Sequence, residues 1–74
     1  MKSIAPKEMP VLPEGMNGWA RSTKRAGGMF HAHAIGFTAC KSLLLDRHYS
    51  AEANGVHDMQ CWGVCPRCYR KGGN

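Results

Sequence analysis

The chain has 74 residues, enough for one domain, with ten lysines and arginines against five acidic residues. The resulting formal net charge of +5 allows an anionic partner such as nucleic acid but does not require one. A chain of this size buries roughly 60% of its unfolded surface, so its apolar core alone gives little stability. Disulfides or a metal ion are the usual supplement, and four cysteines are present.

Residues 1–18 are predicted to form an extended, flexible arm, because prolines at 6, 10 and 13 exclude a regular helix. This segment has no apolar run of the 7–15 residues expected of a signal peptide, and no stretch approaches the ~20 apolar residues of a membrane span. We therefore expect a cytoplasmic protein whose folded domain comprises residues 19–74. In that compartment clustered cysteines act as metal ligands or redox groups.

Residues 19–27, with the sequence WARSTKRAG, place three cations beside Trp19: Arg21, Lys24 and Arg25. Such a run is most often a solvated basic loop. A cation next to an aromatic ring is also the combination that binds phosphates and stacks on bases. These three residues are therefore candidates for nucleic-acid contact.

Residues 29–42, with the sequence MFHAHAIGFTACKS, are predicted to form a β-hairpin. A glycine at the first of two central residues is typical of a type II′ turn, which places Gly36 and Phe37 in the loop. Ile35 then pairs with Thr38, and His33 lies opposite Cys40. Side chains that face each other in this way are ~5 Å apart and can reach one ion.

Residues 43–55 are ambiguous, because three consecutive leucines fit a buried strand while Asn54-Gly55 resembles the end of a helix. We expect a helix or helical turn here, followed by a loop. The last block contains the spacing C-x2-C at Cys65 and Cys68, which lets two sulfurs converge on one ion, and a brief basic turn follows it.

Tetrahedral zinc takes four ligands, usually as two pairs from a hairpin and a knuckle. The predicted Zn²⁺ ligands are His33, Cys40, Cys65 and Cys68. Two residues compete for the fourth place: His31, on the same strand face as His33, and Cys61, which would make an all-thiolate site. The fold class that follows is α+β, a small zinc-stabilised domain with a hairpin, a zinc knuckle and a short helix.

Catalytic interpretations of the same residues fit less well. The spacing from Cys61 through Cys65 to Cys68 is that of the iron–sulfur motif of radical-SAM enzymes, which need a large barrel around the cluster. A thioredoxin-type couple requires a βαβ fold. A nucleobase deaminase requires H-x-E, and HAHA has no glutamate. A metal-dependent nuclease would need more acidic ligands than the aspartates offer. We therefore expect no enzymatic activity.

Residues 31–70 resemble small zinc-binding proteins of actinobacteria and bacteriophages, which have a histidine on a first strand, then T-x-C after a turn, then C-x2-C with a basic tail. The resemblance implies that His33 or His31, Cys40, Cys65 and Cys68 bind the metal. Members often have glycine after the first cysteine, where this chain has Lys41.

Two functions of different class follow as expectations. One is a nucleic-acid-binding accessory or regulatory factor, in which Trp19, Trp62 or Tyr69 stacks and phosphates are met by Arg21, Lys24, Arg25, Arg67, Arg70 and Lys71. The other is a protein-interaction module, such as a phage-encoded modulator of a host protein, with an apolar patch of Trp19, Phe30, Leu44 and Trp62. Neither requires a small-molecule substrate.

Overall fold

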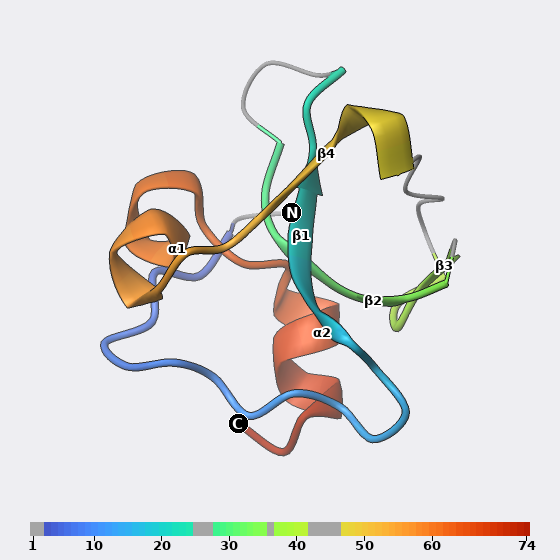
Figure 1. The fold of residues 1–74 in the computed structure, drawn as a ribbon. Coiled ribbons are helices and arrows are strands. Elements are labelled where there is room, and N and C mark those ends of the chain that lie inside the picture. Colours follow the sequence, from blue (N-terminus) through green and yellow to red (C-terminus); the bar gives the residue numbers. More distant parts are fainter. Residues whose placement is uncertain (1–2, 25–27, 36, 42–46) are drawn as a thin grey trace.

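The computed structural model describes residues 3–24, 28–35, 37–41 and 47–74. Within them, an antiparallel sheet has the strand order β3-β2-β1-β4 (Figure 1). Its strands are β1 (Gly18–Ser22), β2 (His31–Ala34), β3 (Phe37–Thr38) and β4 (Ser50–Glu52). A 3₁₀ turn, η1 (Arg47–Tyr49), precedes β4, and the helices α1 (Val56–Trp62) and α2 (Pro66–Lys71) follow it. The α+β composition expected from the sequence is confirmed. Neither these helices nor any other described segment forms a helix long and apolar enough to cross a membrane.

The β2–β3 hairpin exists as predicted, but its register differs. Ala34 pairs with Phe37 and His33 with Thr38, where the sequence predicted Thr38 opposite Ile35. Phe37, predicted to lie in the loop, is a strand residue, as suits an aromatic side chain; Gly36 lies outside the described residues. Moving the turn by one residue displaces every cross-strand partner by two. The pairing continues with a hydrogen bond from the Ala39 N–H to the Ala32 carbonyl (2.8 Å), which brings Cys40 opposite His31.

Residues 50–52 correct a second expectation. The sequence predicted a helix or helical turn within residues 43–55 and then a loop, but Ser50–Glu52 form β4 and pair with β1. The helical turn that was predicted within this stretch is present as η1. Residues 42–46 lie outside the described part of the chain. Alanine and glutamate favour helices intrinsically, so pairing with the edge of β1 overrides local preference here.

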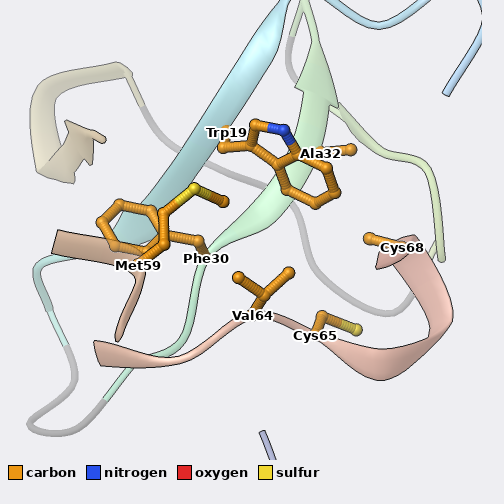
Figure 2. Close-up of a cluster of buried hydrophobic side chains, with 7 residues drawn as sticks. All are labelled: Trp19, Phe30, Ala32, Met59, Val64, Cys65 and Cys68. Atoms are coloured by element: carbon orange, nitrogen blue, oxygen red, sulfur yellow. The ribbon is translucent and has the colours of Figure 1, made fainter. Parts of the chain in front are cut away.

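The core lies between the sheet and the two helices. Figure 2 shows its buried side chains gathered from all parts of the chain: Trp19, Phe30, Ala32, Met59, Val64, Cys65 and Cys68. Trp19 and Ala32 are cross-strand partners in β1 and β2, and Met59 is the buried residue of α1. Two of the seven are cysteines and one is an alanine, so the described part of the core contains few large apolar groups.

The segment that joins the helices is held by backbone pairing on both sides. Val64 exchanges two hydrogen bonds with Ile4 (2.9 and 2.8 Å), and the Phe30 N–H donates to the Gly63 carbonyl (2.9 Å). The Cys65 N–H in turn donates to the Phe30 carbonyl (2.8 Å). This pairing sets Cys65 beside the start of β2.

The described part of the predicted arm, residues 3–17, forms no helix, and its backbone bends at residues 7–8 and turns at residues 14–15. It follows the surface of the domain: Ile4 pairs with Val64, and the side-chain amide of Asn74 exchanges two hydrogen bonds with the backbone of Val11, both 3.0 Å. Figure 1 shows the carboxyl terminus beside this segment. The flexibility of the arm and the boundary at residue 18 stay predictions.

Candidate metal centre

One group of four potential metal ligands is found among the described residues. It consists of His31, Cys40, Cys65 and Cys68, and one ligand atom from each lies within 4.8 Å of all the others. The His31 Nδ1 atom is 3.4 Å from the Cys40 Sγ atom and 3.8 Å from the Cys68 Sγ atom.

These separations suit a tetrahedral zinc ion. Bond lengths of ~2.3 Å to sulfur and ~2.0 Å to nitrogen place two tetrahedral ligand atoms about 3.5–3.8 Å apart. The two distances from His31 lie close to that range, and the most widely separated pair of ligand atoms would need to approach by about 1 Å. Three thiols and one imidazole are also a donor set typical of structural zinc. The residues therefore fit a metal ion such as zinc.

Each ligand is positioned by backbone pairing around β2. His31 is the first residue of that strand, and Cys40 lies opposite it in the turn after β3. On the other side, Cys65 is fixed by its hydrogen bond to the Phe30 carbonyl and is the N-terminal cap of α2. Cys68 follows in the first turn of α2, and Pro66 between the cysteines starts the helix with the φ it needs. Figure 2 shows Cys65 and Cys68 at the edge of the core, at the start of α2.

Burial gives this group its electrostatic character. Cys65 and Cys68 are fully buried and His31 is 6% exposed. The pKa of the Cys68 thiol is raised from 9.0 to about 12, chiefly because the thiol is removed from water; the neighbouring Cys40 and Cys65 contribute to this rise, and backbone hydrogen bonds at Ala32 and Cys40 oppose it. A thiolate at this position therefore needs a compensating cation, which a bound metal would supply.

Zinc affinity is expected to rise at least tenfold per pH unit between about pH 6 and pH 8. The Cys68 thiol, with its pKa near 12, is protonated throughout that range in the metal-free protein and has to release its proton to bind the ion. Release of one proton per bound ion gives a tenfold change in zinc affinity per pH unit. Release of further protons from the other thiols would make this pH dependence steeper. Competition against a chelator of known pH dependence measures the slope; a flat profile would contradict the assignment of Cys68.

His33, the predicted fourth ligand, is replaced in this group by His31. Its Nε2 atom lies 3.0 Å from the Glu52 Oε1 atom instead, in a contact that spans β1 at Gly18. The cause is the hairpin register, because the two-residue displacement moves the partner of Cys40 from His33 to His31. The other alternative, Cys61, is exposed and lies outside the group.

Thr38 and Lys41 lie beside the group and help to shape it, and the sequence had not indicated these structural roles. Thr38 is fully buried, and its hydroxyl lies 3.5 Å from the Cys40 Sγ atom, so it can orient that sulfur. Lys41 has a φ of 59°, the left-handed conformation that favours glycine. The available signal for Lys41 was the glycine that the zinc-binding proteins resembled by this chain often have after the first cysteine, because glycine adopts the left-handed conformation readily.

The residues predicted to bind nucleic acid lie in two separate regions of the structure. At the end of β1, the Arg21 guanidinium lies 3.7 Å from the centre of the Trp62 ring and the Lys24 ammonium 4.5 Å from that of Tyr49. Arg25 lies outside the described residues, and Trp19 is buried and cannot stack on a base.

The second place is the outer face of α2. Arg67, Arg70 and Lys71 are exposed and have the i, i+3, i+4 spacing of one helix face, while Cys68 is buried. In the described structure none of these three cations forms an ion pair. Figure 1 shows the end of β1 at the top and the end of α2 at the bottom, so the two basic places do not form one surface.

Two of the four residues predicted to form an apolar patch for a protein partner are buried in the structure. Trp19 and Phe30 are buried in the core at 5% and 1% exposure, and Leu44 lies outside the described residues. Trp62 is 39% exposed and is covered on one face by Arg21.

Comparisons with models of known protein families, with curated proteins and with solved structures give no match for this chain. The resemblance to small zinc-binding proteins of actinobacteria and phages therefore stays a hypothesis based on its motifs.

Proposed function

We propose that the chain is a small non-enzymatic zinc-binding protein that acts as a nucleic-acid-binding accessory or regulatory factor in the cytoplasm. The observation that supports its first part is the convergence of His31, Cys40, Cys65 and Cys68 within 4.8 Å. Zinc held by these four residues would have a closed tetrahedral shell, with no open position for a reacting water. The metal is then structural, joining the β2–β3 hairpin to α2.

The nucleic-acid part is supported by the outer face of α2. Arg67, Arg70 and Lys71 project from a helix whose inner side would be fixed by the metal through Cys68 and, at its cap, Cys65. Exposed cations on a rigid element can meet consecutive phosphates, and these three have no ion-pair partner among the described residues that would neutralise their charge. Arg21 and Lys24, each against an aromatic ring, offer a second contact area at the far end of the sheet.

A salt titration tests this proposal. Binding of labelled single-stranded and duplex DNA and RNA by the zinc-loaded protein is expected to weaken steeply between ~50 and ~200 mM salt. Contact with three phosphates gives a slope of log affinity against log salt of about −2 to −3. The Arg70→Ala substitution is expected to weaken binding to all sequences and to reduce the magnitude of the slope of log affinity against log salt by about 1.

Lys7→Ala is the control, because Lys7 is an exposed cation on the N-terminal segment and is not part of α2. It is expected to leave the slope nearly unchanged. Absence of binding at low salt, or equal effects of the two substitutions, would contradict the proposed α2 interface while leaving the zinc assignment untouched.

A further inference from the structure

Helix α1 carries a thiol and an imidazole outside the metal centre. Cys61 and His57 are four residues apart, both side chains are exposed, and the Cys61 Sγ atom lies 3.7 Å from the His57 Nε2 atom. Residues with this spacing lie next to each other on one helix face. Neither residue belongs to the group formed by His31 and the other three cysteines.

The separation of the two atoms matches that of two ligands on one ion. With ~2.3 Å to sulfur and ~2.0 Å to nitrogen, a tetrahedral zinc ion holds a thiolate and an imidazole about 3.5 Å apart. A cation could therefore bind both side chains without a change in the helix. In its absence the same geometry is a thiol–imidazole hydrogen bond, which keeps the two ligand atoms pointing toward each other.

From this geometry we infer that the outer face of α1 is a second, weaker binding site for a thiophilic cation such as Zn²⁺, Cd²⁺ or Cu⁺. The Cys61 thiolate and the neutral His57 imidazole are its two protein ligands, and water fills the other positions on the ion. Binding releases the thiol proton to solvent. Soft and borderline cations are selected because the donors are sulfur and nitrogen without a carboxylate.

The helix holds this pair in place despite its short length. Met59, between the two ligands in sequence, is fully buried in the core, and the Gln60 side chain donates to the Pro6 carbonyl at 2.8 Å. At the end of α1 the Gly63 N–H donates to the Met59 carbonyl at 2.8 Å. These contacts preorganise Cys61 and His57, so binding an ion costs little ordering of the backbone.

The two sites differ in ways that a titration can separate. The metal centre offers four ligands, three of them thiols, and is mostly buried, whereas the α1 site offers two ligands, one of them a thiol, and is open to solvent. The centre therefore fills first. The α1 site exchanges its ion readily and loses it first to a chelator.

Titration of the reduced, metal-free full chain with Cd²⁺, followed by thiolate-to-metal absorbance, tests the inference. Two steps are expected, with absorbance changes in a ratio of about three to one, as the numbers of thiolates dictate. Cys61→Ser should remove the second step and keep the first. His57→Ala should weaken the second step at least tenfold, the order of loss seen when support for a bound metal is removed.

His48→Ala is the control for imidazole loss, because His48 is exposed on η1 rather than α1, and both steps should persist in this variant. A variant that retains the first step still forms the metal centre, which shows that it folds. A parent titration that ends after one equivalent, or a second step that persists in Cys61→Ser, would overturn the α1 site. Failure of the first step would count against the metal centre instead.

Discussion

Replacing Cys68 with serine is expected to abolish the cooperative unfolding transition of the zinc-loaded protein. Structural zinc contributes an apparent ~10–16 kcal/mol in small zinc-finger peptides, which matches or exceeds the ~5–15 kcal/mol total stability of ordinary domains. Loss of one of three thiolates removes most of that contribution. It also places a hydroxyl at a position that is fully buried in the core. The small set of large apolar side chains around it cannot compensate.

Thermal and urea melts of the two proteins measure this effect, and elemental analysis reports the bound zinc. Cys61→Ser is the matched control, since it makes the same change at an exposed cysteine outside the metal centre. That variant should melt like the parent and keep one tightly bound zinc ion. If Cys68→Ser unfolded as cooperatively and at the same temperature as the parent, the metal would not be structural.

Exchange of His31 for alanine is expected to lower zinc affinity by at least ~100-fold, whereas the same change at His33 should leave it nearly unaltered. His31 supplies the only nitrogen ligand of the described group, and its removal leaves three thiolates around the ion. His33 is two residues away on the same strand, but its Nε2 atom contacts Glu52 at 3.0 Å. Since the Glu52 side chain is 67% exposed, breaking that contact should cost only about 0–1 kcal/mol.

The pair of variants is its own control, because both remove an imidazole from β2. Competition with a chromophoric chelator gives the two affinities, and circular dichroism at saturating zinc shows whether each variant folds. Retention of tight binding by His31→Ala together with its loss in His33→Ala would show that the hairpin register expected from the sequence is the correct one.

The hairpin shows how a local prediction can find the right element and still place a different residue in the candidate site from the one that the structure brings there. The alternation around HAHAI indicated a strand, and the glycine after it indicated a turn, so the existence of the hairpin followed from nearby residues alone. The position of the turn was uncertain by one residue, and this error moves a cross-strand partner by two. Two histidines with that same spacing made both registers chemically sensible.

The helices and β4 show the limit of local reasoning in another way. Helix α1 has only seven residues and a single buried side chain, Met59, so it carries little amphipathic pattern. β4 has three residues, of which Ala51 and Glu52 favour helices, and its pairing partner, β1, is about thirty residues away. Elements this short depend on contacts that lie far apart in the sequence.

The sequence by itself determined the kind of chemistry: the C-x2-C spacing, the T-x-C before it and the small core indicate a metal-stabilised α+β domain. Ligand type and close spacing are local properties, so residues within a few positions of each other reveal them. Only the tertiary structure decided that His31 rather than His33 joins the cysteines, that Trp19 is buried and that Cys61 pairs with His57. Those outcomes depend on strand register and on which face packs inward, and both result from the whole chain folding together.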